Sequence, residues 1–594
     1  MKYRWSLAAA QPAAANFLAQ ELKIGSLLAQ CLLNRGLSDP ELVQCFLEPR
    51  LKHLADPFLL PNMDIAVNRL FCALERGERL VIFGDYDVDG VTATALLTEV
   101  LSALGWKVEY YLPHRMDEGY GLSRAGVVNC LKKFPVTLFL AVDCGSNAVE
   151  SIGSLQDQGV DVLVFDHHQV SCPPPKAAAL VNPHLQRSSS ASGATTSSGR
   201  SFHELCSVGL AFKLAHALVK RGRETGLAPA KEFDLRPYLE LVALGTIADL
   251  VPLTGENRIL VGIGLQYLNR TQRPGLLALK EVAQIARPIA GYEVGFQLAP
   301  RLNAAGRLEN ALEALHLLLS RERAEALDLA RRLDAHNRER QQIERNIATE
   351  VIGAMRGRFD AAKDFVIVEG QLIWHVGVVG IVASRVLHEF YRPTIILGGD
   401  AEEWRGSGRS IDGFDLAAAL RECSDLLVRH GGHAMAAGLA IHPNKIDEFR
   451  LRLNELARRT LKPEQLQPTL RLDAEVAPGD VTFERVAELG KLQQTGMGNP
   501  PVQFLIRNVT HQRPPQRMGQ EKKHAKLWIT DGAATCEAVL WGIADAPLPA
   551  DHFDLAFSPQ LNEFNGTSSI QLKVLDWRPT ETSNFGANKC GQLT

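Results

Sequence analysis

Four short apolar runs, separated by stretches of helical character, constrain the fold of this 594-residue chain more than any other feature. The runs read RLVIFGD, KVEYYLP, VTLFLAVD and DVLVFDHH, and they are rich in β-branched and aromatic residues. Helix-like segments lie near 91–104, 123–133 and 147–157, between the runs. Strands that alternate with helices form parallel sheets covered on both faces, so the pattern predicts an α/β fold with a doubly wound parallel sheet.

The rest of the chain changes character several times. Residues from Trp5 to about Asp56 have a helical pattern, and a second alternation of strands and helices begins at Asp364, with helices near 377–389, 415–428 and 444–458. After Pro463 the runs become short and β-like. We expect a multidomain chain with a helical N-terminal segment at 1–56, a catalytic α/β domain at 57–320, a connecting helix at 321–355, a smaller α/β domain at 356–460, an OB-type β-barrel at 461–580 and a tail at 581–594.

Three segments carry alternatives. The charged stretch ALDLARRLDAHNRERQQIERNIATEVIGAM has no Gly or Pro before Gly353, which favours a stiff helix joining two lobes over a coiled-coil dimer arm. The Ser-rich stretch at 187–200 cannot bury enough apolar surface to order itself, and we interpret it as a surface loop. The segment EKKHAK at 521–526 is expected on a loop of the barrel, either as a strand-binding platform or as a solvated basic loop.

Composition excludes several classes of protein. A net charge of −3 excludes a uniformly cationic surface, so any affinity for nucleic acid must come from a local groove. No stretch approaches the ~20 apolar residues that a membrane-spanning helix needs. The ten cysteines include no CxxC pair, which argues against a disulfide framework and a structural zinc site. With no apolar signal segment at the N-terminus, we expect a cytoplasmic protein.

Polar side chains follow the ends of the predicted strands. The carboxyl ends of parallel strands meet at one edge of a sheet, where ligands bind. The first strand is followed by DYDVDG, the second by PHRMDEGYG, the third by DCGS and the fourth by DHH, and a later helix ends in the sequence GTIADLVPL. The acidic and histidine residues at these ends are Asp85, Asp87, Asp89, Asp143, Asp166, His167, His168 and Asp249.

Several carboxylates gathered in one cleft repel one another unless a cation lies between them. Carboxylates with one or two imidazoles and no thiolate favour Mn²⁺ or Mg²⁺ over zinc, and the number of ligands is sufficient for two ions. Such a pair of ions can hydrolyse a phosphodiester. Taken singly, each acidic cluster could be only a turn or a helix cap. An EF-hand calcium loop is disfavoured, since a strand and not a helix precedes DYDVDG.

The motifs DYDVDG, DCGS, DHH and GTIADLVPL, in this order, resemble the four motifs of the DHH phosphoesterases. In DCGS, Ser146 stands where the family pattern has threonine. The resemblance implies that His168 contacts the scissile phosphate or leaving group, and that Asp166 orients a histidine. It also implies metal ligation by Asp87, Asp89, Asp143, His167 and Asp249, with Asp85 in or beside the metal's coordination sphere and with Asp89 also counted among the catalytic residues.

Further blocks extend the resemblance to nearly the whole chain. From about Phe17 to Trp577 the sequence resembles the RecJ exonucleases, a family with a DHH domain, a DHHA1 domain and an OB-type barrel. The blocks are PHRMDEGYGL (113–122), PRLNAAGRL (300–308), HNRERQQIE (336–344), WHVGVVGIVASR (374–385), GSGRSIDGFD (406–415) and GGHAMAAGL (431–439).

The RecJ resemblance implies roles for residues outside the metal cluster. Arg115, Ser407 and Arg409 would hold the 5′-terminal phosphate, and Tyr120 would lie at the entrance against a base. Arg301 and Arg307 would contact backbone phosphates, with a surface salt bridge as the alternative for each. His375 and His433 would lie near the active cleft, and a satisfied core histidine is the alternative for both.

Together these residues imply a two-metal exonuclease that digests single-stranded DNA from 5′ to 3′ in recombination and repair. A monomer is expected, with the single-strand-binding protein and a RecQ-type helicase as partners. One alternative is a DHH-family phosphodiesterase for short RNA or cyclic dinucleotides, which chain-length preference would distinguish. The other is a catalytically inactive DNA-binding scaffold, which a metal titration would distinguish.

Overall fold

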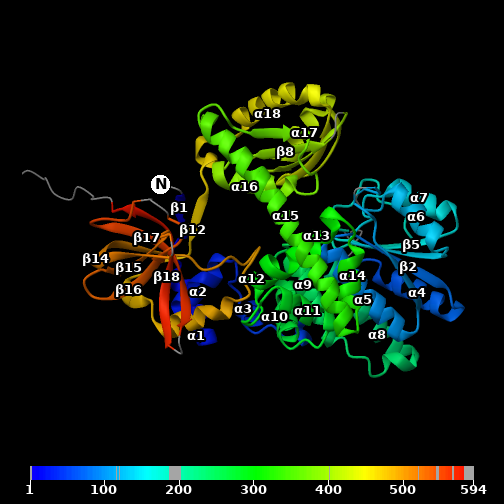
Figure 1. The fold of residues 1–594 in the computed structure, drawn as a ribbon. Coiled ribbons are helices and arrows are strands. Elements are labelled where there is room, and N and C mark those ends of the chain that lie inside the picture. The colour runs from blue at the N-terminus through cyan, green and yellow to red at the C-terminus, as the bar shows by residue number, and fades with distance from the viewer. Residues whose placement is uncertain are drawn as a thin grey trace, which may run out of the picture. The chain divides into compact units, whose positions relative to one another are not determined.

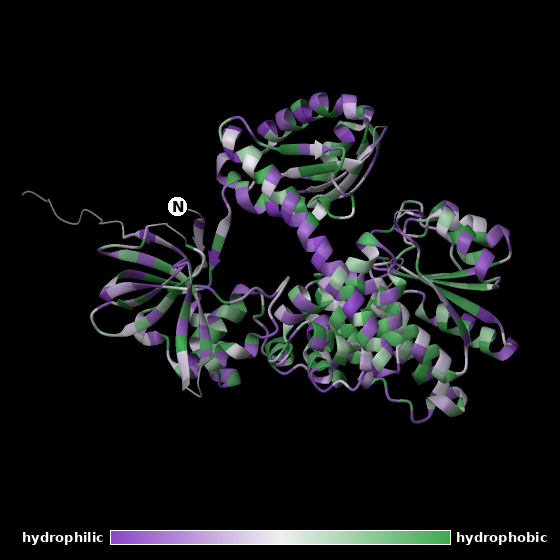
Figure 2. Cartoon of the chain, viewed as in Figure 1, coloured by the Kyte–Doolittle hydropathy of each residue, from purple (hydrophilic) through white to green (hydrophobic). Residues whose placement is uncertain are grey.

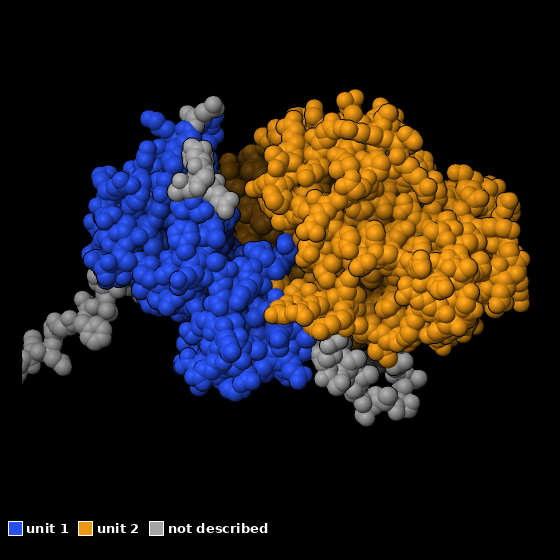
Figure 3. Space-filling view, turned by 90° about the horizontal axis from the view of Figure 1, so that it is seen from below, with its two compact units in different colours: residues 1–47, 467–495, 499–594 blue, residues 48–466, 496–498 orange. Residues whose placement is uncertain are grey.

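The computed structural model describes residues 3–115, 117–119, 121–185, 202–399, 402–519, 521–543, 547–564 and 567–580. The chain forms two compact units, coloured separately in Figure 3. Unit 1 comprises residues 1–47, 467–495 and 499–594, and unit 2 comprises residues 48–466 and 496–498. The Ser-rich stretch at 187–200 and the tail at 581–594 lie outside the described residues. Among the helices that are described, none is both long and apolar enough to cross a membrane.

Unit 2 contains a five-stranded, wholly parallel sheet of order β3-β2-β4-β5-β6. Leu80 and Ile82 of β2 pack into one apolar cluster, whereas Val81 and Phe83 pack into another, because successive strand residues point to opposite faces. The predicted doubly wound sheet is thus confirmed. Its strands are β2 Arg79–Gly84, β3 Lys107–Tyr111, β4 Leu138–Val142, β5 Asp161–Phe165 and β6 Ala179–Val181.

Helices cover both faces of this sheet (Figure 1). Leu97 of α5 and Leu214 of α8 enter one apolar cluster, and Ile152 of α7 enters the other. Figure 2 shows the strands between these helices as mainly hydrophobic, as expected for a parallel sheet covered on both faces. The covering helices are α4 Met63–Arg76, α5 Val88–Leu104, α6 Arg124–Lys133, α7 Val149–Asp157 and α8 Ser207–Thr225.

A helical region follows the sheet and leads into α15, Arg323–Arg358, which has 36 residues. Leu333 of α15 packs into the core of the first sheet, and Val351 packs into a second core with α16. Because α15 belongs to two cores of one chain, it is the predicted connecting helix and not a coiled-coil arm. The helices before it are α9 Leu239–Ala248, α10 Gly255–Asn269, α11 Pro274–Val282, α12 Gly291–Glu293, the π-helical turn η5 Val294–Leu298, α13 Ala299–Leu308 and α14 Leu312–Leu319.

The second half of unit 2 is a smaller α/β layer with the strand order β10-β11-β9-β8-β7. Only β7 and β8 run parallel. The predicted helix at 415–428 is wrong at its end: α17 stops at Glu422, and Leu427 begins β10, whose backbone pairs with β11. The elements are β7 Ile367–Gln371, α16 Val379–Phe390, β8 Thr394–Gly399, β9 Trp404–Arg409, α17 Leu416–Glu422, β10 Leu427–His433, β11 Ala436–Ile441 and α18 Ile446–Thr460.

Unit 1 contains the predicted β-barrel. The barrel closes because β14 pairs with β15 on one side and with β17 on the other. Leu28 and Leu32 of the N-terminal helices share the barrel's apolar core with Phe504, so both ends of the chain build one unit. The elements are β1 Arg4–Leu7, α1 Pro12–Leu22, α2 Ser26–Asn34, α3 Pro40–Leu47, β12 Thr469–Leu472, β13 Ala474–Glu475, α19 Phe483–Leu489, β14 Phe504–Met518, β15 His524–Thr530, β16 Thr535–Leu540, β17 Phe553–Phe564 and β18 Thr567–Pro579.

Two local predictions in unit 1 are wrong. Trp5, expected in a helix, lies in β1, which pairs in parallel with β12. The indole Nε1 of Trp5 donates a hydrogen bond of 2.9 Å to Asp576, and the Arg578 guanidinium lies 4.4 Å from the ring centroid. Long-range pairing therefore overrides the local pattern. The EKKHAK segment is a loop only in part, since β15 begins at His524 and contains Lys526.

Candidate metal centre and nucleic-acid interface

The acidic and histidine residues meet where the strand order reverses. β2 lies between β3 and β4, and β5 follows on the far side of β4. Asp85 follows β2, Asp143 follows β4, and Asp166 with His167 follows β5, so the three loops lie side by side at one sheet edge. A crevice beyond the carboxyl ends of the strands, at such a reversal, is where open α/β sheets bind ligands.

Asp87 and Asp89 are fixed by the start of α5. Asp87 is the N-cap residue, and its Oδ1 accepts hydrogen bonds from the backbone N–H groups of Asp89 and Gly90 at 2.9 and 3.1 Å. Asp89 is buried in the first turn. Its two carboxylate oxygens accept N–H groups of Ser207 and Val208, at the start of α8, at 2.7 and 2.8 Å. Two helix N-termini therefore hold these carboxylates.

Asp143 is held by its backbone and by a hydroxyl. Its φ of 64° is in the left-handed region that non-glycine residues rarely adopt, and this conformation turns the chain sharply after β4. The Ser207 hydroxyl donates a hydrogen bond of 2.8 Å to Oδ1 of Asp143. Strain at a residue of this kind is typical of functional sites.

His167 lies among three carboxylates. Its Nε2 is 3.5 Å from Oδ2 of Asp249, 3.6 Å from Oδ1 of Asp143 and 3.9 Å from Oδ2 of Asp89. The residues divide into overlapping groups whose ligand atoms lie within 4.8 Å of one another. The groups are Asp89 with His167 and Asp249, Asp143 with His167 and His168, and Asp85 with Asp87 and Asp143.

Burial and mutual repulsion raise the pKa values of the carboxyl groups. Burial and the charge of Asp87 raise the pKa of Asp85 to about 8 and that of Asp89 to about 6. Burial and the neighbouring carboxylates raise the pKa of Asp143 well above its ordinary value. Burial and the charge of Asp89 raise the pKa of Asp249 to about 9. These carboxylates are gathered at a cost that a bound cation would offset.

The ligand atoms also fit a divalent cation by their hydrogen bonding. Within the described part of the chain, Oδ2 of Asp85, Oδ2 of Asp143, Oδ2 of Asp249 and Nε2 of His167 are buried without a hydrogen-bond partner. Buried polar atoms in proteins are normally paired, and an ion is one of the explanations for those that are not. The set offers only carboxylate oxygens and imidazole nitrogens, which suits Mn²⁺ or Mg²⁺ chemistry.

His168 forms a tight pair with Asp166. Nδ1 of His168 lies 2.7 Å from Oδ1 of Asp166, which also accepts the His168 backbone N–H at 3.1 Å. Burial disfavours the imidazolium, but the hydrogen bond and charge of Asp166 outweigh it and raise the pKa of His168 to about 9. The same hydrogen bond holds the pKa of Asp166 below its ordinary range, against the effect of burial. The Asp166 carboxylate therefore favours the protonated form of His168.

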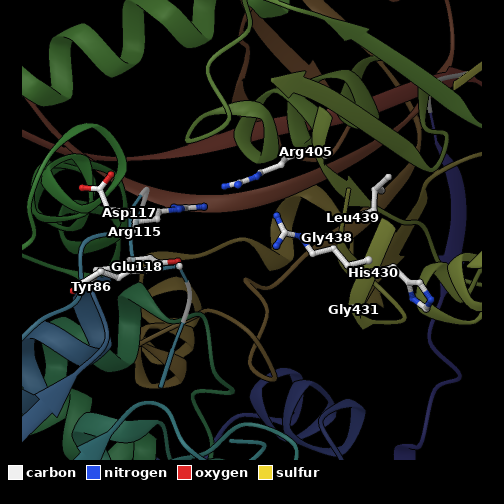
Figure 4. Close-up of a pocket in the computed structure, with 12 residues that line it drawn as sticks. Tyr86, Arg115, Asp117, Glu118, Arg405, His430, Gly431, Gly438 and Leu439 are labelled. Atoms are coloured by element: carbon white, nitrogen blue, oxygen red, sulfur yellow. The ribbon is translucent and has the colours of Figure 1, made fainter. Parts of the chain in front are cut away.

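Arginines line a pocket of about 690 Å³ beside the metal cluster. Arg115 comes from the loop after β3, and its guanidinium lies 5.2 Å from the ring centroid of Tyr86. Arg405 and Arg429 come from the second sheet. Figure 4 shows Arg115 and Arg405 pointing toward one another across the pocket. The acidic Asp117 and Glu118 also line the pocket, but the three arginines outnumber them, which favours a polyanion that passes between the two layers of unit 2.

A second anion-binding arrangement lies at the start of α16. Nη1 of Arg409 donates a hydrogen bond of 3.0 Å to the Ser407 hydroxyl. A Cβ at Gly380, in the first turn of α16, would lie 2.9 Å from Oγ of Ser407 and 3.3 Å from Nη2 of Arg409. Burial lowers the pKa of Arg409. A helix N-terminus, a guanidinium and a hydroxyl thus converge, as phosphate sites require.

The structure places the other predicted residues as follows. Arg301 forms an ion pair with Asp334 at 2.9 Å and donates to the Gln297 carbonyl, so it has a protein partner. Arg307 donates to the Gly377 carbonyl, and burial with the charge of Arg115 lowers its pKa to about 10. Nδ1 of His375 accepts a hydrogen bond from the Gly377 N–H. His433 is exposed in β10. Tyr120 lies outside the described residues.

Two supporting residues, Ser207 and Asn182, escaped the sequence analysis, and a third, Ser146, was noted there only as part of the DCGS motif. Ser207 holds Asp143 and Asp89, as described above. Ser146 donates its backbone N–H to Asp166, and Nδ2 of Asn182 donates to the Ser146 hydroxyl and to the His168 carbonyl. A serine at a predicted helix start and an asparagine after an apolar run are common in any protein. Only the sheet topology brings them to the cluster.

Comparison with known families gives three matches along the chain. Residues 79–246 match the N-terminal domain of the DHH family. Residues 363–459 match the DHHA1 domain, and residues 472–576 match the RecJ OB domain. The three matches together fall on both α/β layers of unit 2 and on the barrel of unit 1.

Individual proteins give longer matches. The chain is 36% identical over 593 residues to the single-stranded-DNA-specific exonuclease RecJ of Bacillus subtilis, covering 98% of this chain and 72% of the relative. It is 34% identical over 537 residues to the corresponding Escherichia coli protein, covering 87% and 90%. The crystal structure of RecJ from Thermus thermophilus in complex with Mn²⁺ superposes with a TM-score of 0.82 at 30% identity, covering 98% of this chain and 80% of that one. The corresponding Mg²⁺ complex gives a TM-score of 0.76.

Proposed function

The chain belongs to the RecJ family of single-stranded-DNA-specific exonucleases, and from this premise we propose that it degrades single-stranded DNA from the 5′ end to mononucleotides. One observation carries the proposal: unit 2 combines the acidic and histidine cluster with the anion-binding arrangement of Ser407, Arg409 and α16. Hydrolysis of a phosphodiester needs the first site. A preference for a 5′ terminus needs the second, because the protein must distinguish a terminal phosphate from an internal one.

The metal is Mn²⁺ or Mg²⁺, the ions named for the related complexes, and we propose two ions per active site. When bound, two such ions polarise the phosphodiester, activate a water molecule and neutralise the leaving oxygen. The ligand groups overlap, since Asp143 belongs to two of them and His167 to two, which supports more than one ion position. The proposed ligands are Asp85, Asp87, Asp89, Asp143, His167 and Asp249.

We assign the proton and charge chemistry to His168. The hydrogen bond with Asp166 fixes the ring's orientation and favours its protonated form, while Asn182 and Ser146 hold the loop. When protonated, a ring beside the scissile phosphate would stabilise the charge that develops on the leaving oxygen. Asp166 is the positioning residue of the pair.

The 5′ phosphate is assigned to Arg115, Ser407 and Arg409. Arg115 faces the pocket, and the other two residues lie at the N-terminal end of α16. A terminal phosphate carries more negative charge than an internal one, so this group of donors favours a strand end. Tyr120, which precedes the first residue of α6 by four positions, is proposed to stack against a base at the entrance.

Backbone contacts are proposed for Arg307, whose helix α13 lies against the metal loop. Arg301 keeps the same proposed role, and its ion pair with Asp334 supports a guanidinium held at a fixed place. His375, whose pKa is lowered by burial and by the charge of Arg115, is proposed to lie beside the bound phosphate. His433 is proposed to border the same cleft from β10.

The biological setting is proposed from the family. We propose a monomer that acts in DNA recombination and repair with the single-strand-binding protein and a RecQ-type helicase. A cytoplasmic location is supported by the nine cysteines of the described residues, which form no disulfides with one another. We also propose the domain limits 57–320, 356–460 and 461–580 for the DHH, DHHA1 and OB domains.

The test is digestion of a single-stranded oligonucleotide labelled at its 5′ or its 3′ end, with Mn²⁺ or Mg²⁺. We expect immediate release of a 5′-labelled mononucleotide, and loss of this product in Asp87→Ala. An Arg409→Gln variant should lose the preference for a 5′ phosphate over a 5′ hydroxyl while it retains metal binding. Release from the 3′ end, or cleavage of dinucleotides alone, would contradict the proposal.

A further inference from the structure

Two exposed aromatic rings lie at the start of the helical segment that ends at the metal loop. Tyr292 of α12 is 56% exposed and Phe296 of η5 is 70% exposed. The rings stack on one another, with centroids 4.9 Å apart and an interplanar angle of 28°. The guanidinium of Arg287 lies 5.6 Å from the centroid of Tyr292, and it is fixed by an ion pair of 2.6 Å with the buried Glu293.

The core does not need these rings. Val294 and Leu298 are the residues of this turn that enter the apolar core, at 0% and 1% exposure. Tyr292 and Phe296 are four residues apart and therefore share the opposite, solvent-facing side of the helix. Two stacked rings in water forgo the free energy of burial, which indicates a partner for them.

The helical segment connects the rings to the catalytic edge. Oδ1 of Asn303 accepts the backbone N–H of Val88, the residue between the proposed ligands Asp87 and Asp89. At a rise of 1.5 Å per residue, the seven residues from Phe296 to Asn303 span roughly 10 Å. That length corresponds to roughly three nucleotides at 3.4 Å each. Moreover, η5 packs on α9, the helix whose C-cap residue is Asp249: a Cβ at Gly295 would lie 4.0 Å from Ile247.

We propose that Tyr292 and Phe296 form a base-stacking platform for the single strand, a few nucleotides away from the scissile phosphate. This inference rests on the proposed function, because it takes single-stranded DNA as the occupant. Every base has a π-face, so paired rings hold a strand of any sequence. Arg287 adds a cation beside the rings for the backbone. Together these features give the strand a second point of attachment.

The platform predicts an effect that grows with the length of the strand. For Tyr292→Ala/Phe296→Ala, the ratio of kcat/KM for a 20-nucleotide oligo(dT) to that for a trinucleotide should fall tenfold or more. The single variant Phe296→Trp, which keeps a ring, should have the parent's ratio. Phe296→Leu, which keeps apolar surface without a ring, should have a lower ratio than the parent. Phe17→Ala is the matched control, since Phe17 is also 56% exposed but lies on α1; its ratio should stay that of the parent.

A second measurement locates the platform on the strand. The strands have 20 nucleotides and differ in the position of a single abasic site. The parent protein should bind more weakly when the abasic site lies at one or two adjacent positions. The double variant should bind these strands as well as it binds the others. An unchanged length ratio and an unchanged abasic profile would overturn the platform and leave the exonuclease intact. If the parent binds strands with this profile but digests none, the proposed function fails and the platform stands. If it binds no single strand, both fail.

Discussion

At the scale of single residues, the acidic and histidine cluster depends on residues that hold the proposed metal ligands in place without being ligands themselves. The sequence was sufficient to predict that the carboxylates and histidines lie together, because acidic residues after apolar strands must meet at one edge of a parallel sheet. Ser207 could not be predicted in this way. It follows Asp143 by 64 residues, and its contacts with Asp143 and Asp89 exist only after α8 packs against α5.

Ser207→Ala should weaken the metal site without unfolding the protein. The change removes the hydroxyl that donates to Asp143 but keeps the backbone N–H that donates to Asp89. Loss of a group that orients a ligand typically costs about 10- to 100-fold in metal affinity. Calorimetric titration with Mn²⁺ measures this affinity. Ser154→Ala, on the exposed side of α7, is the control. Equal affinities for both variants would contradict the assigned role.

His216 should give a pH-dependent contribution to stability. Burial and the charge of Lys213 lower the pKa of His216 to about 4, below the ordinary 6.5. Between these values the unfolded chain binds a proton that the folded protein does not. The free energy of unfolding should therefore fall as pH drops from about 6.5 to about 4, by about 2–3 kcal/mol for this residue.

His216→Gln should remove this contribution to the fall in the free energy of unfolding at acidic pH. Denaturant unfolding at a series of pH values, at saturating Mn²⁺, measures the difference between the variant and the parent. The exposed His388→Gln on α16 is the control and should follow the parent curve. A His216→Gln curve that runs parallel to the parent from pH 7 to pH 4 would refute the assignment.

At the scale of elements, local pattern predicted most helices and strands of unit 2, since their periodicity agrees with the tertiary structure. It failed where distant segments decide. β1 is a strand only because β12 lies beside it, and α17 ends early because Leu427 begins β10, which pairs with β11. Helix packing adds a further constraint that no pattern reveals: α13 approaches the metal loop so closely that Gly306 leaves no room for a side chain. A Cβ there would lie 2.6 Å from the carbonyl oxygen of Tyr86.

Gly306→Ala should therefore displace α13 from the metal loop. We expect destabilisation of about 1–3 kcal/mol and a loss of exonuclease activity. The control is Gly353→Ala in the interior of α15, where no atom lies within 4 Å of the new Cβ. That change should stabilise the protein by about 0.5–1 kcal/mol, because alanine favours the helix. Thermal unfolding separates the two; stabilisation by both would show that α13 tolerates the methyl group.

At the scale of the whole molecule, unit 1 is built from the two ends of the chain. Arg35 of the N-terminal segment forms a buried ion pair of 3.2 Å with Asp473 and donates to Asn499 and to the Pro500 carbonyl. The sequence predicted the barrel and the N-terminal helices separately. It gave no indication that they share one core, because apolar periodicity shows that a face is buried and not what covers it.

Arg35→Met should destabilise unit 1 selectively. It removes the positive charge beside Asp473, whose carboxylate keeps hydrogen bonds from Asn34 Nδ2 and the Gln503 N–H, so we expect a cost of about 1.5–3 kcal/mol. Arg50→Met, which breaks the exposed pair with Glu48, should change stability by less than about 0.5 kcal/mol. Hydrogen exchange resolved by peptide measures both units at once. Equal loss of protection in peptides of both units would mean that the two units unfold as one.

The crowded carboxylates at the edge of the first sheet also make the metal a ligand for folding. An ion that binds only the folded protein stabilises it by RT ln(1 + [L]/Kd), about 2.7 kcal/mol at a hundredfold excess over Kd. Repulsion between the carboxylates strengthens the dependence of folding stability on metal concentration. The ion removes this repulsion in the folded protein, whereas the carboxylates of the unfolded chain lie far apart and do not repel one another. Metal supply would thus set how long the protein survives proteolysis as well as how fast it cuts DNA.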